Sequence, residues 1–166
     1  MCGVIVQEDG LMEQFVFYYQ YSSGFLKIEG EGEGLTSINF SEKSGKAVGA
    51  SPEILKQTIK QLDEYFNGER KEFTLRIKPE GTDFQKKVWS ALSKIPFGQT
   101  STYGRIADEI GHKNAARAVG GACNRNPFPI IIPCHRVLGA NGSLTGFGGG
   151  MGIKKQLLDL EAGARM

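Results

Sequence analysis

The hydrophobic pattern of this 166-residue chain changes its period near residue 80, and this change most limits the folds available to it. Before residue 80, aromatic and β-branched residues gather in short segments separated by turn residues, a pattern typical of antiparallel strands joined as hairpins. After residue 80, apolar residues recur at helical spacing between glycine and proline breaks. The segments predicted as strands are residues 15–21, 25–29 and 35–40.

The first half also contains one predicted helix. Ser51 is a suitable N-cap residue, and Pro52 suits the first helical position. The helix is expected to end at Asn67 and Gly68, before a short extended segment at residues 73–77. The apolar residues expected on its buried face are Ile54, Leu55, Ile59, Leu62 and Phe66.

The second half is predicted to be mainly helical. Thr82 and Gln85 have the spacing of a capping box, which opens a helix that extends to about Lys94. Two short helices, at about residues 103–110 and 114–124, flank a tight turn. This arrangement indicates a helix-turn-helix, although many other helical pairs share it.

These elements predict an α+β fold with two domains. Residues 1–80 would form a small antiparallel sheet with one helix, and residues 81–166 a mainly helical C-terminal domain containing the helix-turn-helix. The first domain carries 9 Lys and Arg against 13 Asp and Glu, a net charge of −4, and the second carries 11 against 5, a net charge of +6. Such segregation favours a polyanion as the partner of the second domain, although many solvated faces are also basic.

Composition argues against several classes of protein. No apolar run approaches the ~20 residues that a membrane-spanning helix needs, so no membrane association is expected. The N-terminus has no basic leader and is not expected to be a signal peptide. Three cysteines, an odd number, argue against a disulfide framework and favour the reducing cytoplasm. With two histidines and no C-x-x-C or H-E-x-x-H motif, no metal site is expected.

A cysteine and a histidine, Cys134 and His135, stand side by side after the apolar residues 130–132. A thiol beside an imidazole is the minimum needed to make a thiolate, the nucleophilic form of cysteine. A lone cysteine would more simply be a buried small hydrophobe. A Cys-His hydrolase is an alternative, but its two residues must face each other directly, and adjacent side chains do not.

The predicted helix at residues 114–124 has almost no bulk except Arg117. Its adjacent glycines, Gly120 and Gly121, each lower helix stability by ~1 kcal/mol relative to alanine. Such a helix favours close approach of a partner, either another helix in a core or a nucleic-acid groove on a basic surface. Arg117 taken alone would fit a surface ion pair, and a non-catalytic DNA-binding regulator is a further alternative.

Residues 82–161 together resemble the methylated-DNA–protein-cysteine methyltransferases, also called 6-O-alkylguanine-DNA alkyltransferases, while the first half is similar only in outline. The family moves the alkyl group of 6-O-alkylguanine in DNA irreversibly onto one of its own cysteines. The resemblance implies a single turnover on a base flipped out of the duplex, no cofactor, double-stranded DNA as partner, and a monomer. The matching blocks are residues 117–122, 126–129, 132–137, 148–150 and 157–161.

The resemblance also implies catalytic roles for five residues. Cys134 would accept the alkyl group. His135 would act as the base through a bridging water, and Glu161 would orient it, although a solvated carboxylate is the plainer interpretation of Glu161 alone. Asn126 would brace the turn before the active site, and Tyr103 would lie near the flipped nucleotide, where it can hydrogen-bond the base.

Four further residues would bind the substrate. Arg117 would fill the gap that the flipped base leaves in the stack. Pro129 would form a wall of the base pocket, and the Val137 carbonyl and the Gly148 amide would hydrogen-bond the guanine. The carbonyl of the catalytic cysteine would accept a further bond from the base.

The sequence also departs from the family pattern. Some members have an N-terminal zinc site, which Cys2 alone cannot form. Phe147 stands where some relatives carry a tyrosine, which bears on how bulky adducts fit. Cys123, on the expected recognition helix, is predicted to be a packing residue. Relatives without the reactive cysteine bind damaged DNA without repairing it, so a non-catalytic sensor of alkylated DNA is the alternative function.

Overall fold

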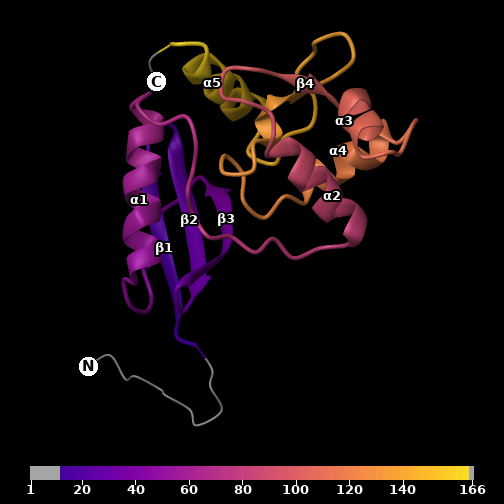
Figure 1. Cartoon of the computed structure of the whole chain (residues 1–166). Helices are drawn as coiled ribbons and strands as arrows, with labels where there is room; N and C mark the ends of the chain where they lie inside the picture. Colours follow the sequence, from indigo (N-terminus) through magenta and orange to yellow (C-terminus); the bar gives the residue numbers. More distant parts are fainter. Residues whose placement is uncertain (1–11, 165–166) are drawn as a thin grey trace.

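A computed structural model describes residues 12–164, and the prediction about Cys2 lies outside this range. The first half is a three-stranded antiparallel sheet in the order β1-β2-β3, with α1 packed along it (Figure 1). Leu26, Ile28 and Ile38 of the sheet are fully buried. All three predicted strands are confirmed, and the elements are β1 (Gln14–Tyr21), β2 (Gly24–Glu31), β3 (Gly34–Ser41) and α1 (Glu53–Phe66).

The start of α1 differs from its prediction by one residue. Pro52, with φ −66° and ψ 165°, is the N-cap, so Ser51 is not. The fixed φ of proline suits both the N-cap and the first helical position, so the local sequence does not decide between them. A carboxylate from the β2–β3 turn supplies the acceptor instead, because the Ile54 N–H donates to Glu33 Oε2 at 3.3 Å.

The buried face of α1 also differs from the prediction at its C-terminal end. Ile54, Leu55 and Leu62 are buried as expected. Tyr65 is fully buried, whereas Phe66 is half-buried and stacks on aromatic rings of β1. Tyr65 therefore points toward the second half of the molecule, where its hydroxyl donates a hydrogen bond to Glu161.

The second half is mainly helical, as predicted. The capping box is present, since Gln85 N donates to Thr82 Oγ1 at 3.2 Å and Thr82 N donates to Gln85 Oε1 at 3.0 Å. A short parallel strand pair, β4 with β5, was not predicted. The elements are α2 (Asp83–Leu92), β4 (Ser101–Thr102), α3 (Tyr103–Glu109), α4 (Ala116–Asn124), the 3₁₀ helix η1 (Cys134–Arg136), β5 (Val137–Leu138) and α5 (Met151–Glu161).

The predicted helix-turn-helix corresponds to α3 and α4, which lie side by side (Figure 1). Gly111 follows α3 with φ 78°, in the left-handed region that favours glycine. Asn114 is also left-handed, with φ 66°, so α4 begins at Ala116 rather than at Asn114. The Trp89 indole N–H donates to the carbonyl of Ala122 at 2.9 Å and fixes α4 against α2.

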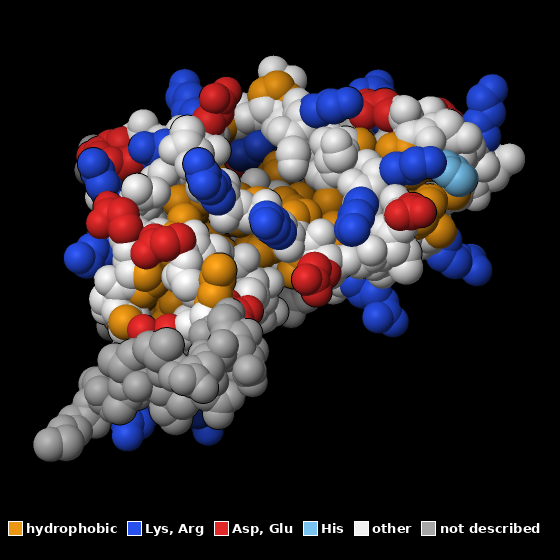
Figure 2. Space-filling model, turned by 60° about the horizontal axis from the view of Figure 1, so that its bottom comes forward, with side chains coloured by type: hydrophobic (Ala, Val, Ile, Leu, Met, Phe, Trp, Pro, Cys, Tyr) orange, Lys and Arg blue, Asp and Glu red, His pale blue; other side chains and the backbone are white. Residues whose placement is uncertain are grey.

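The two halves meet along β3 and share one hydrophobic core. The Ile38 N–H of β3 donates to the Pro127 carbonyl of the second half at 2.8 Å, and the Phe40 ring of β3 lies edge-to-face on Phe147 of the second half. In Figure 2, acidic side chains gather mainly on the sheet side of the molecule, while Lys and Arg spread over both halves. Among residues 12–164, no helix is long and apolar enough to cross a membrane.

Candidate active site

Cys134 begins the 3₁₀ helix η1 and lines a cavity of about 130 Å³. The turn before it is held by Asn126, whose Oδ1 accepts from Phe128 N at 2.9 Å and whose Nδ2 donates to the Ile132 carbonyl at 2.8 Å. Ile130, within this turn, has φ 74°, a conformation that a β-branched residue adopts only when its surroundings impose it. The cavity is lined by Asn39, Phe40, Cys123, Asn124, Asn126, Pro129, Cys134, Phe147, Gly148 and Gly149.

His135 is completely buried and faces Glu161. Its Nε2 lies 2.7 Å from Glu161 Oε1, so the carboxylate favours the tautomer with the proton on Nε2. Its Nδ1 makes no hydrogen bond to any described residue and keeps a lone pair available. Burial lowers the pKa of His135, and the hydrogen bond and charge of Glu161 oppose this only in part. The imidazole is therefore neutral at pH 7, as a base must be.

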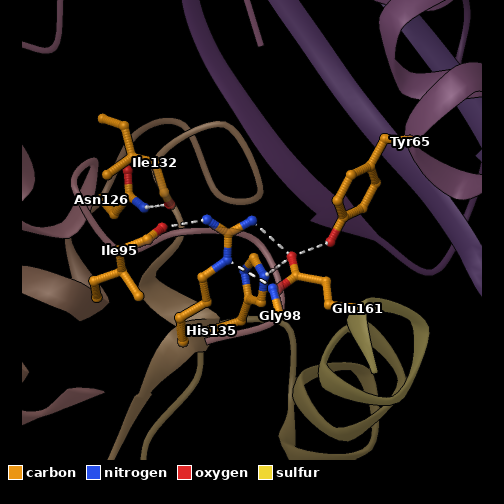
Figure 3. A network of polar contacts seen from close by, with 8 residues as sticks. Tyr65, Ile95, Gly98, Asn126, Ile132, His135 and Glu161 are labelled. Atoms are coloured by element: carbon orange, nitrogen blue, oxygen red, sulfur yellow. Dashed lines mark hydrogen bonds and ion pairs between the residues drawn. The ribbon is translucent and has the colours of Figure 1, made fainter. Parts of the chain in front are cut away.

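The Glu161 carboxylate is the centre of a buried polar network (Figure 3). Arg136 binds it through two hydrogen bonds, Nε to Oε2 at 2.8 Å and Nη2 to Oε1 at 2.9 Å. The Tyr65 hydroxyl donates to Oε1 at 2.8 Å, and the Gly98 N–H lies 3.4 Å from Oε2. Burial raises the pKa of Glu161, but the hydrogen bonds and charges of His135 and Arg136 overcome this and lower it to about 2.

The Cys134 thiol is 5% exposed, and its environment opposes ionisation. Burial raises its pKa, while the Asn126 hydrogen bond and the charge of Lys154 counteract this only partly. The resting residue is therefore a thiol that needs a base to become nucleophilic. Cys123, 6% exposed and lining the same cavity, is packed as predicted, and burial raises its pKa to about 12.

A buried lysine lies beside this site. Lys154 Nζ donates to the Val137 carbonyl at 2.6 Å and to the Thr145 carbonyl at 2.9 Å. It also lies 5.8 Å from the ring centre of Tyr103, whose hydroxyl donates to the same Thr145 carbonyl at 3.0 Å. Tyr103 and Val137, both predicted site residues, are thus joined to α5 through Lys154.

The predicted residues occupy four places, and the first of these is the surroundings of Lys154, where Tyr103 and Val137 lie. Cys134, Asn126, Pro129 and Gly148 line the cavity. His135 and Glu161 form the buried network next to Cys134. Arg117 lies apart from both, exposed on α4, and forms no ion pair with an acid of residues 12–164.

Sequence reasoning gave no role to Arg136, Lys154 or Tyr65. Arg136 lies in the matching block 132–137, and an arginine that becomes buried needs a partner charge. Lys154 shares a helix face with Leu157 and Glu161, a spacing that would have indicated its burial. Tyr65 had no local signal, because its partner lies 96 residues away.

Two family models match the chain: 6-O-methylguanine DNA methyltransferase, ribonuclease-like domain, over residues 16–79, and 6-O-methylguanine DNA methyltransferase, DNA binding domain, over residues 83–163. A Methylated-DNA–protein-cysteine methyltransferase of Methanosarcina acetivorans is 49% identical over 143 residues, which cover 83% of this chain and 92% of that protein. A Mycobacterium tuberculosis protein of the same name is 46% identical and covers 83% of this chain and 86% of its own length.

Solved structures are similar as well. The crystal structure of Mycobacterium tuberculosis OGT in complex with DNA matches with a TM-score of 0.81 and 43% identity, covering 89% of this chain and 92% of that one. An O6-methylguanine DNA methyltransferase from Methanococcus jannaschii matches with a TM-score of 0.69 and 31% identity, covering 90% and 95%. Because both family models and these relatives span most of its length, the chain belongs to the 6-O-methylguanine DNA methyltransferase family.

Proposed function

We propose that this chain repairs DNA by moving the alkyl group of 6-O-alkylguanine irreversibly onto Cys134, once per molecule. The observation that carries the proposal is the buried Cys134 thiol beside a neutral His135 whose Nε2 is held by Glu161. The names of the related proteins and the solved complex of one of them with DNA support it.

Transfer begins with loss of the thiol proton. His135 Nδ1 takes the proton from Cys134 through a bridging water, and the Glu161 carboxylate stabilises the resulting imidazolium. The thiolate attacks the alkyl carbon in line, a carbon–sulfur bond forms, and the carbon–oxygen bond to guanine breaks with its electron pair. The imidazolium returns the proton to guanine through the water; if Tyr103 protonates guanine instead, the imidazolium proton restores the Tyr103 hydroxyl. The thioether product is stable to hydrolysis, so the step occurs once and uses no cofactor.

The lesion reaches Cys134 only after the base leaves the duplex stack, which costs on the order of a few kcal/mol. We assign α4 to the DNA surface and Arg117 to the gap in the stack. The exposed Gly121 supports this, because a Cβ atom built there would meet no atom of residues 12–164 within 4 Å. Packing within this part of the chain does not require that glycine, whereas close approach of a DNA backbone would. The net charge of +6 in the second half agrees with a polyanion partner.

Other residues would hold the flipped base. Pro129 and Gly148 line the cavity, so the ring of Pro129 would form a wall and the Gly148 amide would donate to the 6-oxygen. The carbonyls of Cys134 and Val137 would accept from the base, and the Val137 oxygen has a second lone pair beyond its bond to Lys154. We place the reaction in the cytoplasm, since the described cysteines, Cys123 and Cys134, are free thiols.

The test is the intact mass of the protein after incubation with a duplex that carries one 6-O-methylguanine. We expect one added methyl group that saturates at one per protein, and peptide mapping should locate it on Cys134. Cys134→Ala should bind the duplex without reacting, and Cys123→Ala is the matched control that should react normally. If the wild type binds the lesion without an adduct, the chain is a non-catalytic sensor of alkylated DNA.

A further inference from the structure

The edge of the N-terminal sheet reaches the cavity that contains Cys134. Asn39 and Phe40, both on β3, are among its lining residues. The ring of Phe40 forms an edge-to-face pair with Phe147, with ring centres 5.5 Å apart and an interplanar angle of 62°. Because Phe147 belongs to the loop between β5 and α5, this wall of the cavity is built from both halves of the molecule.

Phe40 is the fixed member of this pair. Its backbone pairs with Leu26 in the sheet, and the nearby Ile38 N–H is bonded to the second half. Phe147 lies instead in a glycine-rich loop, in which Gly146 has φ 39° and Gly150 has φ 93°. A loop of this composition adopts other conformations at little steric cost, whereas a sheet position does not.

The loop and the Phe40 ring are packed without spare room. A Cβ atom built at Gly149 would lie 2.7 Å from Cδ2 of Phe40 and 3.1 Å from Cε1 of Phe147. The cavity of about 130 Å³ is lined on this side by Phe40 and Phe147, and Cys134 lines it as well. An alkyl group brought to Cys134 would therefore share this cavity with the Phe40 ring, which the sheet holds in place.

We propose that Phe40 is a specificity-determining residue that limits the size of the alkyl group transferred to Cys134. The inference rests on the function proposed above. A methyl group adds little to the volume of the base, whereas a benzyl group would come into steric contact with the Phe40 ring. Shortening residue 40 should therefore favour bulky adducts selectively, because the space it frees is of no use to a methyl group.

The experiment uses two duplexes, one carrying 6-O-methylguanine and one carrying 6-O-benzylguanine. Intact mass measures the rate at which Cys134 acquires the methyl or the benzyl group. We expect Phe40→Ala to raise the benzyl-to-methyl rate ratio at least about tenfold, the discrimination that one or two methylenes give in an apolar pocket. Phe40→Leu should give a smaller rise. Phe25→Ala, a half-buried phenylalanine on the neighbouring strand, is the matched control and should leave the ratio unchanged.

An unchanged ratio in folded Phe40→Ala, or equal losses of both rates, would overturn the inference and leave Phe40 as a packing residue. Thermal unfolding of each variant shows whether it is folded, and Phe40→Leu decides the question if the alanine variant is not. The wild-type methyl transfer separates the two proposals. If the wild type transfers neither group, the proposed function fails, whereas normal wild-type transfer with an unchanged ratio removes only the role of Phe40.

Discussion

The Glu161 carboxylate accepts hydrogen bonds from several segments of the chain, and two of its partners follow Cys134 directly. Glu161 Oε1, which holds His135, also accepts from the Arg136 guanidinium, so the orientation of the imidazole and the neutralisation of the buried charge depend on one side chain. A carboxylate in this position can stabilise an imidazolium, whereas an isosteric amide cannot.

Glu161→Gln should therefore slow methyl transfer by roughly 100-fold or more, the usual contribution of acid–base catalysis. The substitution also leaves Arg136 buried without its partner charge, which should cost about 3 kcal/mol of stability without unfolding the protein. Single-turnover rates and urea unfolding measure the two effects. An unchanged transfer rate would remove Glu161 from the proton relay.

Stability should fall as the solution becomes acidic, because both groups of this pair have lowered pKa values in the folded state. The contribution of His135 and Glu161 to the free energy of unfolding is fully present above pH 6.5, the ordinary pKa of histidine. It decreases first as His135 of the unfolded chain takes up a proton, and again between pH 4.5 and about 2, the ordinary and folded pKa values of Glu161.

Urea unfolding at a series of pH values tests this expectation. The loss attributable to the carboxylate should be roughly 3 kcal/mol across its window. Glu161→Gln should show a much smaller loss between pH 4.5 and 2. An equal loss in this variant would assign the acid sensitivity to other groups.

At the scale of elements, α4 combines low bulk with one long side chain. Arg117→Ala removes the group that would fill the stack but leaves the cavity and its network intact. We expect repair of 6-O-methylguanine in a duplex to slow at least about tenfold, since the unstacking cost of a few kcal/mol is no longer offset. Reaction with free 6-O-benzylguanine should be unchanged, and equal losses for the two substrates would reject the stack-filling role.

Most elements could be predicted because their signals are local. Strand alternation and turns located β1, β2 and β3, and the spacing of Thr82 and Gln85 located the start of α2. The start of α1 could not be predicted, because Glu33 of a distant turn caps it. The helix α4 begins late because Asn114 adopts a left-handed conformation, which its sequence permits but does not require.

At the scale of the whole molecule, a tyrosine of the first half completes the network of the second. Tyr65→Phe removes one hydrogen bond to Glu161 and should lower stability by about 1.5–3 kcal/mol, the range for bonds to charged groups. It should also slow methyl transfer modestly, because Glu161 holds His135 less firmly. Tyr19→Phe, which removes a hydroxyl bonded to Asp63 away from the site, is the control that should leave the rate unchanged.

The site itself was predictable only where its residues are contiguous or match a motif. Cys134, His135 and Glu161 were predicted in this way; the structure places the last two in contact, and their catalytic roles stay predictions. Phe40 and Tyr65 were missed because each meets the second half through contacts that span most of the chain. The local sequence pattern predicts only that residues of this kind are buried. Which side chains they contact depends on how the two halves pack together.

The position of Glu161 in α5 has a consequence for the newly made protein. During synthesis, Cys134 and His135 emerge before Glu161, which lies 26 residues after His135. In the mechanism proposed above, the imidazole lacks the carboxylate that orients it until α5 docks, so the thiol has no competent base until then. A protein that can react only once would thus become reactive late, after α5 has docked, and its Cys134 thiol would stay unreactive before that.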